Sequence, residues 1–361
     1  MTGTPARRGA ILLAAAALLA TCSAPLPPTP TIPTTPGSRA YAWTDMVVGF
    51  IGSGTNDAWH VSNVASFDKY ASDNAITLRP FDAAGKFANQ IAQFHLFGAD
   101  PSVNVIVLDP TQAGGYDAAL KEAAASGKVV VVEGRRIDAD PTLYATYVGS
   151  DLTAEGSKAA STLCDLLADS SEKNVAEIFE TAEPSFEAAR SAGFRASMSD
   201  CGITAPTDLQ AALSPSAAGS ASQAESESAA AVAAWLGRRR DIQGIFAHGD
   251  SEALGAIRAI KAAGLRPGKD ILIVSIGTTF EATCDGLAYL VSGEVSAEIE
   301  YNPLLGPQVY AAALNALNGT PQPKWIPAQE GLTLAAQGPD ALAGCAGCPG
   351  YQMPSICHST Y

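Results

Sequence analysis

The sequence predicts an α/β protein made of two doubly wound lobes, each with a parallel sheet covered by helices. Its 361 residues exceed one typical domain and are enough to bury two cores. With 47% hydrophobic and only 16% charged residues, the bulk of the chain does not have the composition of a disordered protein. Short apolar runs also alternate with helical stretches in two successive blocks, which is typical of parallel sheets buried on both faces.

The elements follow one another regularly in both blocks. In the first block we expect strands at Met46–Ile51, Ile76–Leu78, Val103–Leu108 and Lys128–Val132, with helices from Ala58, at Lys86–Phe97 and at Tyr116–Ala125. After Gly149 the pattern resumes, with strands near Val175–Phe179, Ile242–Ala247 and Ile271–Ile276. In this architecture ligands bind beyond the carboxyl ends of the strands, so the loops that follow each strand are the expected site.

Charge and motifs exclude several functions. The net charge of −14 provides no attraction for phosphates, so we expect no nucleic-acid partner. Gly52-Ser53-Gly54 follows a strand, but Asp57 stands where a dinucleotide motif needs its third glycine. The sequence has no phosphate-loop lysine motif and no Gly-x-Ser-x-Gly, and its four histidines lack metal-ligand spacing. We therefore predict a protein that is not an enzyme and uses neither cofactor nor metal.

The N-terminus predicts export and anchoring. Arg7 and Arg8 precede an apolar run over Ala10–Ala20, which is typical of a secretory signal and too short for the ~20 residues of a membrane span. Leu19-Ala20-Thr21-Cys22 resembles a bacterial lipobox, which implies that residues 1–21 are removed and that Cys22 carries lipid. A plain signal with an incidental cysteine is the alternative. Residues 22–44 are proline-rich and predict an extended tether on a cell membrane, facing outside or the periplasm.

Six further cysteines favour disulfides in an exported chain. Our hypothesis pairs Cys164 with Cys201, and Cys284 with a cysteine of the tail. Connectivity does not follow from sequence, however. Zinc is the open alternative for the tail, which contains Cys345, Cys348, Cys357 and His358.

Four stretches resemble one known family: Tyr147–Asp151 (YVGSD), Ala247–Ala256 (AHGDSEALGA), Gly264–Ile276 (GLRPGKDILIVSI) and Asn302–Pro307 (NPLLGP). They are similar to the ribose/galactose-type sugar-binding proteins of ABC importers, and most similar to the galactofuranose-binding branch. The resemblance runs from about Met46 to Gly331. It implies a type 1 periplasmic-binding fold whose chain crosses between the lobes three times. The first lobe would comprise 45–148 plus 302–323, and the second 149–301 plus the Cys-rich tail 324–361.

The resemblance also implies a ligand site between strand ends. Matching positions are Trp59, His60 in place of the family's arginine, Tyr116, Arg135, Arg190 and Asp250. A ring such as that of Trp59 can pack against the C–H face of a sugar, and arginines can donate to its oxygens. Asn56, Asp57, Asp109 and Glu133 are candidates for additional polar contacts. The competing interpretations are a core role for Trp59, solvated surface charges for the arginines and a helix cap for Asp250.

Three departures from the family concern this site. Gly134, Gly249 and Gly277 stand where the family has Asp, Asn and Asp. Each lost hydrogen bond to a buried ligand hydroxyl costs about 1 kcal/mol or more. Either the pocket is enlarged for a bulkier or modified sugar, or transport is lost while the fold is kept. The retained Trp59, Arg135 and Arg190 favour the first interpretation.

We therefore expect a monomeric, membrane-anchored solute-binding lipoprotein. It would capture a sugar or sugar-like ligand by hinge closure and deliver it to the permease subunits of an ABC importer. A ligand-sensing receptor for a membrane signalling protein is the main alternative. An exported carbohydrate-active enzyme is a second one, although no nucleophile or carboxylate pair stands out.

Overall fold

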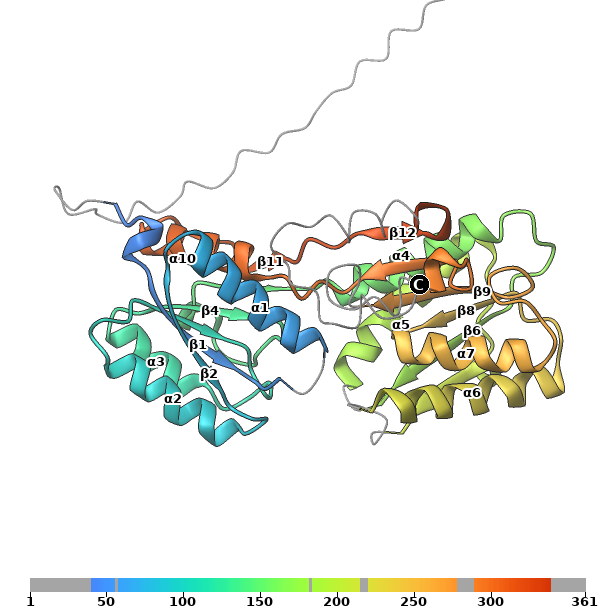
Figure 1. The fold of residues 1–361 in the computed structure, drawn as a ribbon, viewed down its shortest axis with the longest axis horizontal. Helices are drawn as coiled ribbons and strands as arrows, with labels where there is room; N and C mark the ends of the chain where they lie inside the picture. The colour runs from blue at the N-terminus through green and yellow to red at the C-terminus, as the bar shows by residue number, and fades with distance from the viewer. Residues whose placement is uncertain (1–39, 56–57, 182–183, 215–219, 278–288, 339–361) are drawn as a thin grey trace, which may run out of the picture. The chain divides into compact units, whose positions relative to one another are not determined.

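The computed structural model describes residues 40–338, apart from 56–57, 182–183, 215–219 and 278–288. It contains two six-stranded sheets in two α/β lobes, which confirms the predicted fold class (Figure 1). The first sheet has the order β11-β5-β4-β3-β1-β2, and all its pairs are parallel. Its strands are β1 (Val47–Gly52), β2 (Thr77–Asp82), β3 (Val105–Leu108), β4 (Val129–Glu133), β5 (Thr146–Gly149) and β11 (Trp325–Pro327).

The second sheet has the order β12-β10-β9-β8-β6-β7. Only the edge strand β12 runs antiparallel, against β10. Its strands are β6 (Val175–Glu180), β7 (Gln210–Leu213), β8 (Gly244–Ala247), β9 (Leu272–Gly277), β10 (Ala297–Glu300) and β12 (Leu332–Leu334). The observed ends of the seven predicted strands differ from the expected ones by a few residues.

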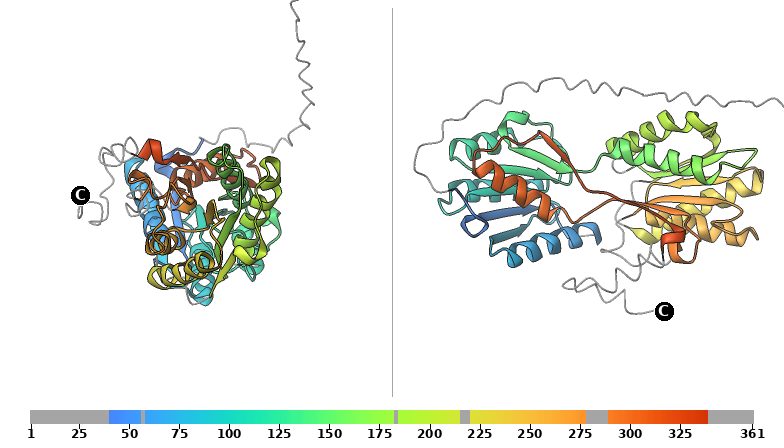
Figure 2. Two further views of the ribbon diagram at one scale, coloured as in Figure 1. Left: turned by 90° about the vertical axis from the view of Figure 1, so that its right-hand side faces the viewer. Right: turned by 90° about the horizontal axis from the view of Figure 1, so that it is seen from above.

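Helices cover both faces of each sheet (Figure 2). On the first sheet, α1 (Ala58–Asp73) and α10 (Gly306–Leu317) cover one face, and α2 (Phe87–Ala99) and α3 (Asp117–Ala125) cover the other. On the second, α4 (Leu152–Leu166) and α5 (Pro184–Met198) lie opposite α6 (Ala221–Arg238) and α7 (Asp250–Ala262). Each lobe therefore has two apolar layers, and the central strands are buried on both sides, as the continuous apolar runs predicted.

The chain passes between the two sheets three times. It leaves the first sheet after β5, returns to it after β10, and leaves it again after β11. Strand β11 pairs with β5, so residues 325–327 lie in the first sheet, whereas the expected boundary at residue 323 put them in the second lobe. The reason is the parallel register of Trp325 with Tyr147, which no local pattern in this short segment indicates.

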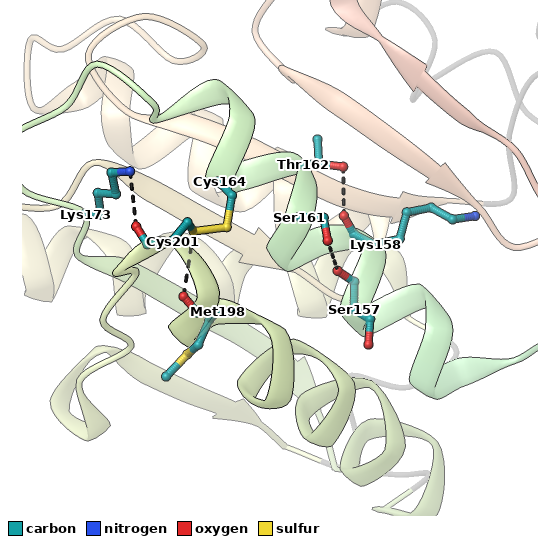
Figure 3. Close-up of a disulfide and its surroundings, with 8 residues drawn as sticks. All are labelled: Ser157, Lys158, Ser161, Thr162, Cys164, Lys173, Met198 and Cys201. Carbon is teal, nitrogen blue, oxygen red and sulfur yellow. Dashed lines mark hydrogen bonds between the residues drawn. A yellow bond between two sulfur atoms is a disulfide. The ribbon is translucent and has the colours of Figure 1, made fainter. Parts of the chain in front are cut away.

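A disulfide joins Cys164 of α4 to Cys201, just after α5, with their Cα atoms 5.7 Å apart (Figure 3). It links the two helices on the same face of the second sheet. Cys22, Cys284 and the tail residues Cys345, Cys348, Cys357 and His358 lie outside the described residues. Within the described ranges, no helix combines the length and the apolar character that a membrane crossing needs.

Candidate functional site

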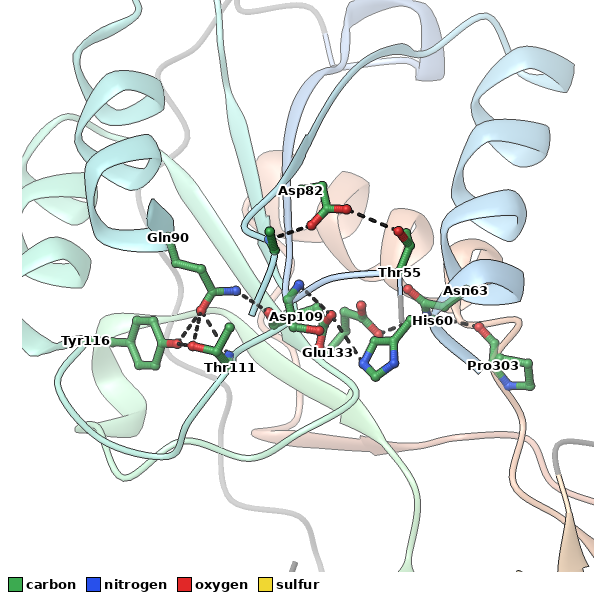
Figure 4. Close-up of polar contacts among 12 residues, drawn as sticks. Thr55, His60, Asn63, Asp82, Gln90, Asp109, Thr111, Tyr116, Glu133 and Pro303 are labelled. Atoms are coloured by element: carbon green, nitrogen blue, oxygen red, sulfur yellow. Dashed lines mark hydrogen bonds and ion pairs between the residues drawn. The ribbon is translucent and has the colours of Figure 1, made fainter. Parts of the chain in front are cut away.

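The first half of the site is a buried carboxylate at the end of β3. Asp109 accepts a hydrogen bond from the backbone N–H of Ser53 at 2.8 Å, and His60 Nε2 lies 3.8 Å from its Oδ2 (Figure 4). Burial raises the pKa of Asp109, and the nearby His60, Ser53 and Arg135 oppose that rise. The start of α1 and the end of β3 thus bring two of the candidate residues, His60 and Asp109, close together.

Glu133 ends β4 and is fully buried beside Asp109. Its Oε2 accepts from Asn63 Nδ2 at 3.2 Å, whereas Oε1 has no hydrogen-bond partner within the described part of the chain. Burial, followed by the neighbouring Asp109 carboxylate, raises the pKa of Glu133 well above its ordinary value. Asn63 also donates to the carbonyl of Pro303 at 3.0 Å, which ties this lobe to the segment that re-enters it.

Tyr116 lies beneath the site instead of lining it, which corrects the expected ligand contact. Its side chain is fully buried in the core between α2, α3 and the sheet. The hydroxyl donates to Gln90 Oε1 at 2.5 Å, and Gln90 Nε2 donates to the carbonyl of Asp109 at 2.6 Å (Figure 4). The aromatic side chain at this helix start fills the core, and its polar end supports the Asp109 loop through Gln90.

An aromatic pair joins residues far apart in the sequence. The indole of Trp59 stacks on the ring of Tyr301, with centroids 5.5 Å apart and planes at 25°. The Arg190 guanidinium lies 5.1 Å from the centre of the same tyrosine ring. Trp59 is 7% exposed and its Nε1 has no hydrogen-bond partner among the described residues. Trp59 thus packs into the core of the first lobe, and its ring also contacts Tyr301.

Arg190 is held in place by carboxylates of its own lobe. Its Nε donates to Glu155 Oε2 at 2.7 Å, and Glu187 Oε1 lies 3.8 Å from its Nη1. Glu187 also contacts the ring of the neighbouring His248, which lies 3.2 Å from Glu177 on its other side. Although burial lowers the pKa of His248, hydrogen bonds to Glu177 and Glu187 dominate and raise it. The surface-charge interpretation of Arg190 is therefore wrong, because the guanidinium is buried and paired.

Arg135 lines a cavity of about 720 Å³. Its guanidinium lies 5.6 Å from the centre of the Phe186 ring. The guanidinium of the adjacent Arg136 lies over the rings of Tyr147 and Trp325, at 4.7 and 4.4 Å from their centres. Two cations and several aromatic rings thus face one space that is large enough for a sugar. Neither Phe186 nor Trp325 was expected in the site.

Asp250 lines a smaller recess of about 140 Å³ in the second lobe, together with Arg190, Gly249, Gly277 and Tyr301. It is the first residue of α7, whose cap residue is Gly249, so Asp250 is not the helix cap. The glycines at the three altered positions stand next to carboxylates. A Cβ at Gly134 would lie 3.5 Å from Asp109 Oδ1, and one at Gly249 or Gly277 would come closer than 3.0 Å to Glu252 or Glu298.

The predicted residues fall into three groups. Trp59, His60, Asp109, Glu133, Arg135, Arg190 and Asp250 lie at the carboxyl ends of strands or in the helices that follow them. Tyr116 supports the site from the core, and Asn56 lies outside the described residues together with Asp57. Sequence reasoning missed Tyr301, although it directly follows β10 and precedes Asn302-Pro303, a place where a crossing between lobes was expected.

Residues 48–321 match the family described as the periplasmic binding protein domain. The galactofuranose-binding protein YtfQ of Escherichia coli (strain K12) is 30% identical over 277 residues, which cover 76% of this chain and 83% of that relative. A structure from Mycobacterium smegmatis in complex with β-D-fucofuranose has a TM-score of 0.65 and 29% identity, and covers 82% of this chain and 94% of its own. The periplasmic binding protein component of the arabinose ABC transporter from Shewanella sp. ANA-3 is bound to α- and β-L-arabinofuranose. It has a TM-score of 0.69 and 26% identity, and the match covers 85% of this chain and 100% of that one.

Proposed function

Because this chain belongs to the family of periplasmic binding proteins, which bind solutes and are not enzymes, we propose that it captures a sugar in its furanose form for an ABC importer. One observation carries the proposal. The ring of Trp59 stacks on that of Tyr301, and Tyr301 in turn lies against Arg190. Asp109 and Trp59 both lie next to Gly134, at the end of β4, which Arg135 directly follows. The similar proteins that bind galactofuranose, fucofuranose and arabinofuranose supply the ligand class.

The chemistry of these residues suits a sugar. The C–H face of a furanose ring can pack on aromatic surface, while its hydroxyls exchange hydrogen bonds with carboxylates and guanidinium groups. Arg135 and the Asp109–His60 pair supply a donor and an acceptor of this kind on one lobe. Arg190 and Asp250 supply them on the other. Hinge closure, with the sugar stabilising a pre-existing closed state, is part of the proposal.

Calorimetric titration and a thermal-shift assay test the sugar site. We expect at least one of D-galactose, L-arabinose, D-fructose and D-ribose, which all form furanose rings in water, to raise the Tm of the purified protein, because a ligand that binds only the folded state stabilises it. Trp59→Ala and Arg135→Ala should each lower the affinity for that sugar about tenfold or more. Arg258→Ala is the control, since that arginine is exposed and paired with Glu225. If none of the four sugars binds, the proposal is wrong.

Lipid anchoring at Cys22 is a separate part of the proposal, and it rests on the lipobox-like Leu19–Cys22. We expect Cys22→Ala to move the protein from the membrane fraction to the soluble fraction of cells. Metabolic labelling with an azido-palmitate should mark the wild-type chain and leave the variant unmarked. Equal release of both proteins into the soluble fraction would show that the leader is a plain secretory signal.

A further inference from the structure

Two buried polar side chains near the recess of the second lobe, Glu298 and Ser275, are not used by the site described above. Glu298 lies in the middle of β10, opposite Ser275 of β9, and parallel register places both side chains on the same face of the sheet. Glu298 is 2% exposed and Ser275 is 1% exposed. Glu298 Oε1 and Ser275 Oγ both have no hydrogen-bond partner among the described residues. Two polar atoms on neighbouring strands are thus buried, and neither has a hydrogen-bond partner in the part of the chain that the structure describes.

Gly277 lines the recess and is also the neighbour of Glu298. Gly277 lines the recess with Asp250, and a Cβ placed on Gly277 would come closer than 3.0 Å to both Glu298 Oε1 and an oxygen of Asp250. Any other residue at 277 would therefore push these carboxyl groups apart. The absence of a side chain here leaves room for the carboxyl group of Glu298, from the neighbouring strand, beside a residue that lines the recess.

The arrangement is costly for the folded protein. A buried polar group left without a partner destabilises the folded state. Burial first, and then the nearby carboxylates of Asp250 and Glu300, raise the pKa of Glu298 well above its ordinary value. Leu or Met would fill the same volume without this cost. An unsatisfied buried group in a native protein needs an explanation, and a ligand that supplies the missing partner is one.

We propose that Glu298 is a specificity-determining residue that exchanges hydrogen bonds with a hydroxyl group of the sugar through the gap at Gly277. Asp250 would flank the same hydroxyl, and Ser275 Oγ offers a second polar atom behind it. The ligand class is therefore a polyhydroxylated ring that directs a hydroxyl into the second lobe. This inference rests on the proposed sugar-binding function. It places on the neighbouring strand β10 the hydrogen-bond acceptor that a glycine at position 277 cannot provide.

The test compares Glu298→Leu and Glu298→Gln with the wild-type protein. Each protein is titrated by calorimetry with D-galactose, L-arabinose, D-fructose and D-ribose. We expect Glu298→Leu to weaken the binding of those sugars that the wild-type protein binds by about tenfold to a hundredfold, because it removes both carboxyl oxygens. Glu298→Gln should retain an intermediate affinity. The Tm of the sugar-free Leu variant should rise by about 2 °C or more, since an unpaired buried group is removed. Glu294→Gln, in a surface pair with Lys261, is the control.

Each outcome decides one part of the argument. Weaker binding by a Leu variant that is as stable as wild type, or more stable, supports the inference. If the wild-type protein binds a sugar and both Glu298 variants bind it within twofold, Glu298 meets only a buried water and the inference is wrong, while the sugar-binding function stands. If the wild-type protein binds none of the four sugars, the proposed function fails and the inference fails with it. If the Leu variant does not fold, the comparison of Glu298→Gln with Glu294→Gln decides.

Discussion

Glu133, Glu252 and Glu298 are buried carboxyl groups at or near the carboxyl ends of strands. Burial is the main cause of the raised pKa in all three. Glu133 belongs to the first lobe, and Glu252 and Glu298 belong to the second. Buried carboxyl groups with a raised pKa near strand ends are more characteristic of functional sites than of structural cores.

Glu252 gives a pH-dependent prediction. Burial raises its pKa from 4.5 to about 8, and the nearby Glu180 carboxylate adds to the rise. The folded state therefore holds a proton that the unfolded state has released, so stability is lost as pH rises from about 4.5 to about 8. We expect Glu252→Gln to remove this loss, so that the variant gains stability relative to wild type across this range, by an amount on the order of a few kcal/mol.

Thermal melts of Glu252→Gln and the wild-type protein at half-unit steps from pH 4.5 to 9 measure this effect. Glu294→Gln controls for the loss of a carboxylate near the surface. A difference in Tm that stays constant, or shrinks, as pH rises would show that the Glu252 carboxyl is not held protonated by the fold.

Helices α4 and α5 determine where Arg190 and Glu155 can meet. They pack so closely that a Cβ on Gly156 would come closer than 3.0 Å to the backbone carbonyl of Arg190. Gly193 meets the backbone of Thr153 in the same way. The disulfide between Cys164 and Cys201 connects the same pair of helices near their far ends. The element that carries the buried arginine is thus fixed by backbone contact, which side-chain rotation cannot relieve.

A matched pair of substitutions tests this packing. Gly156→Ala should destabilise the protein by about 3 kcal/mol or more, because the added methyl group forces two backbones apart. Gly237→Ala should instead be neutral or stabilising by up to about 1 kcal/mol, since it lies near the end of α6 with nothing within 4 Å of the new methyl group. Urea unfolding of both variants measures the difference. Equal effects would contradict the close approach of α4 and α5.

At the scale of the whole molecule, the chain connects its two sheets by three passages, and site residues lie next to them. Tyr301 follows β10 directly, and the carbonyl of Pro303 accepts from Asn63 in α1. Ser150, on the passage after β5, contacts Glu330, on the passage after β11. A movement about these passages would therefore change the contacts of Tyr301 with Trp59 and Arg190.

We expect a bound sugar to reduce the radius of gyration in small-angle X-ray scattering, because hinge closure brings two lobes together around the ligand. The protein should have the mass of a monomer in both states. The Glu298→Leu variant, at a sugar concentration that saturates only the wild-type protein, serves as the control. An unchanged radius for the saturated wild-type protein would contradict hinge closure and leave the sugar site itself intact.

The sequence by itself determined the two-lobe fold and much of the first half of the site. Continuous apolar runs predict buried parallel strands because alternation is lost when both faces are covered. Residues that directly follow such strands, such as Asp109, Glu133 and Arg135, must gather at one edge of a sheet. The resemblance to sugar-binding proteins identified the family, and the match of residues 48–321 to the periplasmic binding protein domain confirms it.

Only the tertiary structure decided which of these side chains are accessible and which carboxyl group lies beside Gly277. Tyr116 points into the core, because the direction of a side chain at a helix start depends on the packing of α2 and α3. Trp59, Arg190 and Tyr301 come from three distant segments, so no local pattern could place them together. In the sequence, Gly277 indicates only that a hydrogen-bond acceptor of the family is missing. In the structure, the parallel register of β9 and β10 places Glu298 beside Gly277. Register between strands is a long-range property, and it determines which carboxyl group fills the space that a glycine leaves.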